Sequence, residues 1–373
     1  MVRRFRLLLL AMLLLLPVEA RAAQKEEKIT AKAWALVEAA SGRLLLGENE
    51  HERRPMASTT KIMTALLLLE SGEDPDALIE VAPEAAGVEG SSVYLHAGER
   101  ISLRDLLYGL MMVSGNDAAV ALAVHHSGSV EAFAARMNAK AAALGCHDTH
   151  FVNPNGLHDP QHYTSAYDLC RMAAAAMALP AFRELVSTEK YTTTTGDRIR
   201  TFRTKNKVLT QVEGGCGIKT GYTRKAGRCL CFAAERQGML LVGAVLNAPD
   251  MWNDGKKLLD RGFSAYELRT FLVPGRTVGQ VSVAGSEKKS LPAAAKEGIL
   301  YPVRRDGQDD AQLAVRFADG LAAPVAPGTI VGEAVLTVNG EQAASVPLLV
   351  SEGAQPLTFR WFLRRVAEAY FAA

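Results

Sequence analysis

A serine and a lysine lie three positions apart in the segment PMASTTKIMTALLLLE, residues 55–70. On a helix, Ser58 and Lys61 share one face, so the lysine amine could accept the serine proton and activate the hydroxyl as a nucleophile. A simpler interpretation is a helix start, in which Ser58 and the two threonines after it cap free backbone N–H groups. Spacing alone does not decide, because Ser-x-x-Lys recurs at Ser187–Lys190 and Ser286–Lys289.

Two further short motifs occur once each, Ser114-Gly115-Asn116 and Lys219-Thr220-Gly221. With the Ser58 segment they form the set that acyl-serine enzymes of the penicillin-binding and β-lactamase type require. Each motif is weak alone, because Ser-Gly is also a common turn and Lys-Thr-Gly a common strand end. All three, in this order, favour nucleophilic catalysis. The other two Ser-x-x-Lys pairs lie in polar stretches and open no apolar helix, so we interpret them as surface.

The first two motifs have distinct expected roles. Lys61 can act as a base only while it is neutral, and both burial under the leucines and the nearby cation of Lys219 would lower its pKa. A turn between two helices can project Ser114 and Asn116 into a shared cleft. There Ser114 is suited to relay a proton, and Asn116 to hold the lysine or a substrate amide.

The third motif is suited to binding. Lys219 and Thr220 on a strand present a cation and a hydroxyl to a substrate carboxylate. Gly221 leaves room for the substrate to lie along the strand edge as an added strand. Backbone N–H groups of Ser58 and Tyr222 are the expected oxyanion hole.

The N-terminus has the pattern of a secretory signal peptide. Three arginines precede an apolar run, Leu7–Val18, and small residues follow at Ala20 and Ala22. We therefore expect a signal peptide over residues 1–22; an uncleaved anchor is the alternative, but the run is short for a bilayer span. The chain has a formal net charge of +2, and removing the signal leaves it close to neutral, so no nucleic-acid partner is expected.

The pattern of expected helices and strands divides the mature part of the chain into units. The first is an α+β region over residues 23–272. A hairpin is expected over residues 33–49, and helices follow, one of them opened by a capping signal at Ser102. After Pro180 come three strands, the last two joined at Gln237-Gly238, and then a helix over residues 256–268. The simplest arrangement is an antiparallel sheet flanked by helices, with a helical subdomain.

The sequence of the C-terminal part predicts two further units, a β domain and a helix. Short alternating strands with Gly and Pro turns indicate a small all-β domain over residues 273–355. Residues 356–373 are expected to form an amphipathic helix with aromatic side chains on one side and arginines on the other. It could pack on the β domain; we favour a helix lying on a membrane, because aromatic side chains and arginines suit the interface. Three arginines argue against a span.

The chain has five cysteines, an odd number, so at least one thiol is unpaired within it. Cys229 and Cys231 would lie on the same face of one strand, which is an awkward geometry for a bridge. We expect buried free thiols.

The chain resembles the D-alanyl-D-alanine carboxypeptidases, the low-molecular-mass penicillin-binding proteins. The resemblance is dense over residues 30–272 and looser beyond them. It rests on RPMASTTKIMTALLLLE, GSSVYLHAGERISLRDLLYGLMMVSGNDAAVALA, FVNPNGLHDPQHYTSAYDL and GGCGIKTGYTRKAGRCL. Some relatives carry an arginine that binds the substrate carboxylate, and Lys205 in RTKNKVL is the candidate substitute.

The resemblance implies a β-lactamase/transpeptidase-like fold and an exported enzyme of the periplasm or cell surface. That enzyme removes the terminal D-Ala from peptidoglycan stem pentapeptides through an acyl-enzyme on Ser58, which β-lactam antibiotics would also acylate. The C-terminal helix would associate peripherally with the outer face of the cytoplasmic membrane. No cofactor or metal is implied.

Four alternatives stay open. A class A β-lactamase needs a Glu-x-x-Leu-Asn segment, and none follows the Ser114 motif. A D,D-endopeptidase would use the same residues as a carboxypeptidase. A non-catalytic cell-wall binding protein is the third. The fourth is a zinc peptidase, for which no His-Glu-x-x-His helix is present but four histidines cluster in one loop, at positions 147, 150, 158 and 162.

Overall fold

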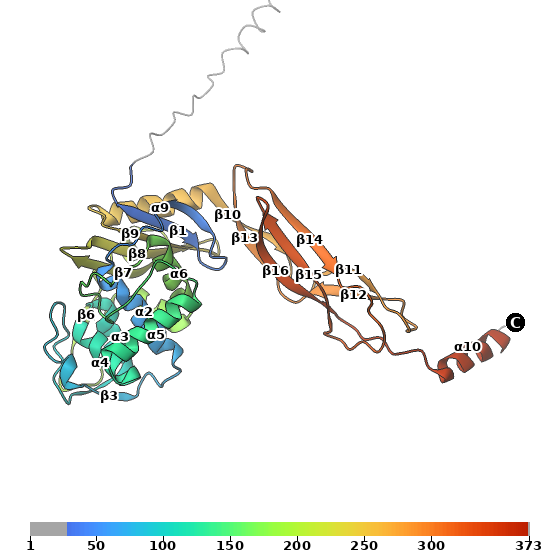
Figure 1. The fold of residues 1–373 in the computed structure, drawn as a ribbon, viewed down its shortest axis with the longest axis horizontal. Coiled ribbons are helices and arrows are strands. Elements are labelled where there is room, and N and C mark those ends of the chain that lie inside the picture. The colour runs from blue at the N-terminus through green and yellow to red at the C-terminus, as the bar shows by residue number, and fades with distance from the viewer. Residues whose placement is uncertain (1–27, 372–373) are drawn as a thin grey trace, which may run out of the picture.

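The computed structural model describes residues 28–371, so the expected signal peptide lies outside the described residues. An antiparallel five-stranded sheet lies at the centre of the first part of the chain, as the sequence predicts (Figure 1). Its strands run in the order β2 (Leu44–Glu48), β1 (Ala33–Glu38), β9 (Met239–Leu246), β8 (Gly227–Arg236) and β7 (Gly215–Thr223). Strand β7 is therefore an edge strand, which leaves one side open for an added strand.

Both faces of this sheet are covered by helices, and every position of β9 is buried. Helix α9 (Met251–Ala265) packs on one face, over Leu36 and Phe232. A Cβ at Gly262 would lie 2.5 Å from Leu36 Cδ2, so this close approach requires glycine. Helix α6 (Ala166–Met177) contacts β1 and β9 from the other face.

The remaining helices form a subdomain in which α2 is central and contacts the others. Three helices begin at a serine whose side chain accepts the backbone N–H three residues on: Ser102, as the sequence predicts, and also Ser129 and Ser165. The subdomain helices are α2 (Lys61–Glu70), α3 (Leu103–Met112), α4 (Asn116–Ser127), α5 (Val130–Ala143) and α7 (Pro180–Ser187). Shorter elements are η1 (Ala57–Thr60), β3 (Leu78–Glu80), η2 (Pro83–Ala85), β4 (Arg100–Ser102), β5 (Lys190–Thr192), β6 (Thr201–Arg203) and α8 (Val208–Gln211).

The C-terminal part is all-β, in two sheets. Strand β10 (Tyr266–Leu272) pairs with β13 (Ile299–Arg304). A five-stranded sheet has the order β11 (Thr277–Ser282), β12 (Ser290–Ala295), β16 (Glu341–Val350), β15 (Ile330–Val338) and β14 (Ala311–Phe317).

Two details of the secondary structure differ from the sequence prediction, the end of helix α9 and the presence of strand β12. The helix expected over residues 256–268 ends at Ala265, because Tyr266 turns inward, where its hydroxyl donates to the Leu45 carbonyl 3.0 Å away. Strand β12 has no sequence signal: its residues, SLPAAA, are weak strand formers, and its pairing with β11 and β16 imposes the conformation.

An arginine joins the two parts of the molecule. Arg43, between β1 and β2, donates to both carboxylate oxygens of Asp309 at 2.8 and 2.9 Å and to the Pro302 carbonyl at 2.6 Å. Its guanidinium also lies over the rings of Tyr266 and Tyr301. The hydrogen bond from Arg43 holds the pKa of Asp309 well below its usual value, so the pair stays charged.

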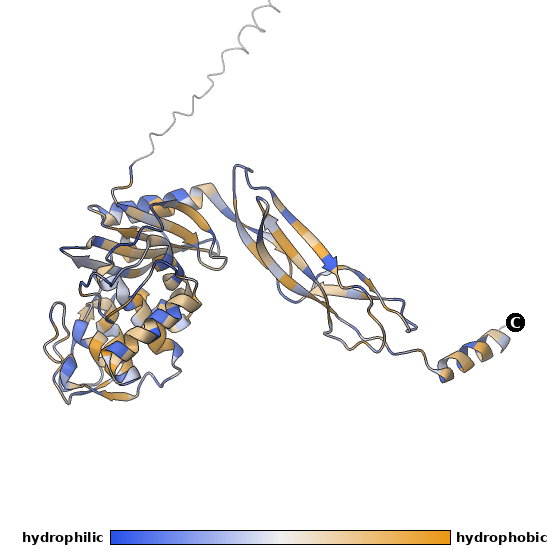
Figure 2. Ribbon diagram, in the orientation of Figure 1, coloured by the Kyte–Doolittle hydropathy of each residue, from blue (hydrophilic) through white to orange (hydrophobic). Residues whose placement is uncertain are grey.

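Helix α10 (Phe359–Phe371) ends the described chain, and hydrophobic and hydrophilic residues alternate along it (Figure 2). None of its residues is buried, and Phe359 and Tyr370 are each 79% exposed. The alternative in which this helix packs on the β domain is therefore wrong. Among residues 28–371, no helix is both long and apolar enough to cross a bilayer.

The five cysteines are free thiols, and all but the half-buried Cys216 are buried. Cys229 and Cys231 lie on the same face of β8, in the core beneath the helical subdomain. Burial raises the pKa of both thiols. The expectation of buried, unbridged cysteines is confirmed.

Candidate active site

The turn that carries Ser58 is η1, which runs directly into α2. Ala57, just before the serine, has a left-handed backbone with φ of 49°. The two threonine hydroxyls do not cap α2; instead Thr59 Oγ1 donates to the Met56 carbonyl and Thr60 Oγ1 to the Ala57 carbonyl, at 2.7 and 2.8 Å. The helix-cap interpretation is thus wrong for these side chains, which stabilise the turn itself.

Lys61 lies one turn after Ser58 and is fully buried. Its Nζ is 3.1 Å from Ser58 Oγ, 2.7 Å from Asn116 Oδ1 and 2.6 Å from the carbonyl oxygen of Asn155. Burial lowers the pKa of Lys61 well below its usual value, and the nearby charge of Lys219 lowers it further. The amine therefore exists in neutral form far more readily than an ordinary lysine.

The three contacts of a neutral Lys61 amine have a defined direction. Such an amine has two N–H groups and one lone pair. The carbonyl of Asn155 and the amide oxygen of Asn116 can only accept, so together they take both N–H groups. The lone pair is left for the hydroxyl proton of Ser58, which is the arrangement a general base needs.

Ser114 and Asn116 lie in the turn between α3 and α4. Ser114 has φ of 66°, and its buried Oγ has no hydrogen-bond partner in the described structure. Leaving a buried hydroxyl unpaired costs about 1–3 kcal/mol, so this group is poised for a partner that a substrate supplies. Asn116 is fixed from behind, since its Nδ2 donates to the Glu89 carbonyl at 2.6 Å and its backbone N–H to the Ser91 carbonyl at 2.7 Å.

The other four predicted residues lie along the edge strand β7. Lys219 is buried; its Nζ donates to the Thr220 carbonyl at 3.0 Å, and burial lowers its pKa to about 7. Gly221 lies so close to the nucleophile that a Cβ there would be 3.0 Å from Ser58 N. Tyr222 is largely exposed beyond it.

These residues surround one cleft of about 400 Å³. Ser58, Ser114 and the segment from Lys219 to Tyr222 line it directly, while Lys61 and Asn116 lie behind Ser58 and contact one another. Lys205, the expected substitute for an arginine, also lines the cleft. The predicted catalytic and substrate-binding residues are therefore brought to this one place.

A further contact at the site is not predictable from side-chain types. The carbonyl of Asn155 belongs to the loop NPNG, which lies against α2 and η1. The Pro154 carbonyl accepts from Thr64 Oγ1 at 2.7 Å, and a Cβ at Gly156 would lie 2.0 Å from the Ala57 oxygen. The turn-rich composition of NPNG signals a loop, but nothing in it marks a ligand for Lys61.

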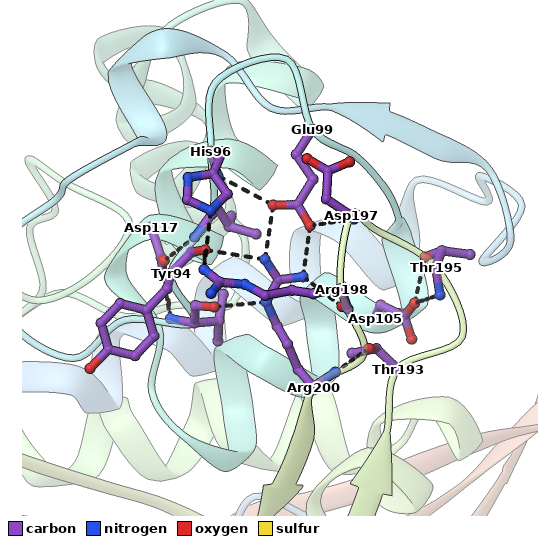
Figure 3. Close-up of polar contacts among 12 residues, drawn as sticks. Tyr94, His96, Glu99, Asp105, Asp117, Thr193, Thr195, Asp197, Arg198 and Arg200 are labelled. Atoms are coloured by element: carbon purple, nitrogen blue, oxygen red, sulfur yellow. Dashed lines mark hydrogen bonds and ion pairs between the residues drawn. The ribbon is translucent and has the colours of Figure 1, made fainter.

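Two loops at the rim of the cleft are held by a rim network, which we define as Glu99, Asp105, Asp117 and Arg200 (Figure 3). Arg200 donates to both oxygens of Glu99 at 2.7 and 2.8 Å. Asp117 accepts two backbone N–H groups from the loop after Ser91, and Asp105 accepts two from the loop between β5 and β6. The network thus connects segments that bring Ser91 and Lys205 to the cleft.

The competing residues lie elsewhere. Ser187 is exposed and donates to the Arg183 carbonyl, and Ser286 lies in the β-rich part. Among residues 28–371, no group of His, Cys, Asp and Glu side chains could hold a metal ion. His162 is buried, and its Nε2 lies 2.7 Å from Thr60 Oγ1.

Comparison with known proteins agrees with this geometry. Residues 19–250 match the sequence profile of the D-alanyl-D-alanine carboxypeptidase family, and residues 266–355 that of the C-terminal domain of penicillin-binding protein 5. The chain is 33% identical to D-alanyl-D-alanine carboxypeptidase DacF of Bacillus subtilis, over 90% of this chain and 88% of that protein.

A solved structure shows the same fold. Penicillin-binding protein 5 from Haemophilus influenzae superposes with a TM-score of 0.75 at 29% identity, covering 88% of this chain and 98% of that one. D-alanyl-D-alanine carboxypeptidase DacA of the same organism is 30% identical over 87% of this chain and 85% of its own length. The chain therefore belongs to the D-alanyl-D-alanine carboxypeptidase family and is a serine-type, penicillin-binding peptidase.

Proposed function

We propose that Ser58 is the residue acylated in this carboxypeptidase and that neutral Lys61 is its base. The observation that carries the proposal is the set of three contacts around Lys61 Nζ, two of which can only accept hydrogen bonds. The Ser58 proton moves to Lys61 Nζ while Oγ forms a bond to the carbonyl carbon of the penultimate D-Ala. The C–N bond to the terminal D-Ala then breaks, and the leaving amine takes a proton that Ser114 relays from Lys61. Water cleaves the resulting ester and releases the shortened peptide.

The substrate would lie along the open edge of β7 as an added strand. Its terminal carboxylate would meet Lys219 and Thr220, with Lys205 at the same cleft. The attacked carbonyl oxygen would accept from the backbone N–H groups of Ser58 and Tyr222. The close approach at Gly221 supports this, because it brings strand and nucleophile to one point.

Mass spectrometry after exposure to penicillin tests the nucleophile. We expect one adduct, on the peptide that contains Ser58, and no adduct in Ser58→Ala. Ser187→Ala, which alters a second Ser-x-x-Lys pair, is the matched control and should label normally. Release of D-Ala from a pentapeptide by Ser58→Ala would contradict the mechanism.

We further propose export directed by residues 1–22, a peptidase domain over 23–272, an all-β domain over 273–355, and membrane association through 356–373. The support for the last is the uncovered apolar side of α10, with Phe359, Phe362 and Val366 exposed. Mature protein should float with anionic vesicles, and protein ending at residue 356 should not. Phe362→Asp should weaken flotation, whereas Glu368→Asp on the polar side should not; equal flotation of all variants would contradict the proposal.

A further inference from the structure

A buried histidine lies directly behind the nucleophile, outside the residues given a role above. His162 is 2% exposed, and its ring packs edge-on against Phe151 at 5.6 Å. One ring nitrogen faces the backbone N–H of Val152, with 3.1 Å between Nδ1 and N. The other, Nε2, is 2.7 Å from Thr60 Oγ1. Both nitrogens of this ring are thus in contact with the loop or the nucleophile turn.

These contacts fix the ring tautomer. Because the Val152 N–H can only donate, Nδ1 must accept and carries no hydrogen. The ring proton of a neutral His162 is therefore on Nε2, and it donates to Thr60 Oγ1. The threonine hydroxyl keeps its own hydrogen for the Ala57 carbonyl, 2.8 Å away. The hydrogen bonds run one way, from histidine through threonine to that carbonyl.

The Ala57 carbonyl determines where the backbone N–H of Ser58 points. The two groups belong to one planar peptide unit, in which C=O and N–H point in opposite directions. Ala57 has φ of 49°, a conformation that costs a non-glycine residue about 1–2 kcal/mol and persists only when its surroundings hold it. A bond that holds the carbonyl on the Thr60 side therefore holds the Ser58 N–H on the opposite side.

We propose that His162 is a positioning residue, which acts through Thr60 to hold the Ala57 carbonyl and so aims the Ser58 N–H at the oxyanion of the transition state. This inference rests on the proposed function, because it assumes acylation at Ser58. His162 does not touch the substrate or the reacting atoms. Its contribution is to keep an oxyanion-hole donor in place before the reaction begins.

The environment of His162 keeps the ring neutral, as the directed bonds require. Burial lowers its pKa to about 4; nearby Asp159 opposes this shift, while His150, His158 and Lys61 add to it. The ring is therefore a neutral donor across the neutral pH range. A second proton would lie on Nδ1 and face the Val152 N–H.

The test measures acylation by a fluorescent penicillin in stopped flow, which separates the acylation rate constant from the dissociation constant of the non-covalent complex. Thr60→Val keeps the shape of the side chain but removes both bonds, and His162→Phe removes the donor. We expect each to lower the acylation rate constant 10- to 100-fold while the dissociation constant stays within about twofold. Thr60→Ser restores the hydroxyl and should react nearly as the wild type does.

A double-mutant cycle makes the result specific. If both residues act through one chain of bonds, Thr60→Val with His162→Phe should be little slower than either single variant. His147→Gln, at an exposed position of the same loop, is the matched control and should change nothing. The proposal would be overturned if the double variant lost acylation rate by the product of the two single losses. It would also be overturned if Thr60→Val acylated at the wild-type rate, and this second result does not depend on whether His162→Phe folds. The position of the penicillin adduct in the wild type distinguishes the role of His162 from the proposed mechanism. An adduct away from Ser58 would overturn the mechanism itself.

Discussion

At the floor of the cleft, Lys61 and Lys219 are buried amines, and neither forms an ion pair with a carboxylate in the described structure. At the rim, Arg200 is paired with Glu99 through two hydrogen bonds (Figure 3). Burial acts on both regions in the same way, by penalising the charged form. At the floor no ion pair among the described residues offsets the cost of burying a charged amine, so the pKa of each lysine falls.

At the rim the same penalty is offset. Burial alone would raise the pKa of Glu99, but the hydrogen bonds from Arg200 and from two backbone N–H groups hold it below its usual value. The ion pair at the rim therefore stays charged and holds its two loops together. The two lysine amines at the floor, in contrast, can lose their protons and become neutral. The difference indicates that the floor is built for proton transfer and the rim for support.

Replacing the base should give the largest effect and separates activity from stability. Lys61→Met should lower D-Ala release and penicillin acylation by about 10³-fold or more, because the serine loses its proton acceptor. Its melting temperature should be unchanged or higher, because a buried amine gives way to an apolar chain of similar length. A turnover assay measures the loss of activity, and thermal unfolding measures the melting temperature.

Lys140→Met is the matched control, since Lys140 pairs with Glu70 at the surface of α5 and should affect neither measurement. A marked fall in the melting temperature of Lys61→Met would show that the buried amine stabilises the fold. The contrast between floor and rim would then be lost.

At the rim, removing one partner should damage stability first. Arg200→Met leaves the Glu99 carboxylate buried without its cation, so the free energy of unfolding should fall by about 3 kcal/mol in urea denaturation. Glu99→Gln combined with Arg200→Met should recover part of this loss. Arg104→Met, which breaks the exposed pair with Asp76, should change little. If Arg200→Met were as stable as the wild type, the rim would not be the supporting region.

The sequence predicts the floor far better than the rim, and the reason is distance along the chain. Ser58 and Lys61 are one helical turn apart, so their contact follows from local geometry. Glu99 and Arg200 are 101 positions apart, and neither lies in a recognisable motif. Their pairing depends on how two loops pack, which residue types do not reveal.

Backbone groups are the second limit. The carbonyl of Asn155 binds Lys61 from 94 positions away, and every residue except proline carries the same donor and acceptor pair on its backbone. No side chain marks this carbonyl. Strand β12 shows the same limit in the fold, because its conformation comes from its neighbours and not from its own residues.

The pH dependence of substrate binding gives the smallest and most specific effect. Burial lowers the pKa of Lys219 to about 7, so the free enzyme loses the cation that faces a substrate carboxylate as the pH rises through that value. For a Lys-D-Ala-D-Ala tripeptide, kcat/KM should therefore fall about tenfold per pH unit above about 7, mainly through a rise in KM. The kcat should hold to higher pH, because a bound carboxylate favours the protonated amine.

Lys219→Arg isolates this effect, because a guanidinium stays protonated throughout and should remove the alkaline fall, even if the variant is slower overall. Stability should change in the opposite direction to activity. Above pH 7 the unfolded chain holds a proton at Lys219 that the folded protein has lost, so stability should rise with pH toward the usual lysine value. Lys219→Met should lack that rise. An alkaline fall that persists in Lys219→Arg would assign it to another group and leave Lys61 as the only floor lysine whose charge matters for the reaction.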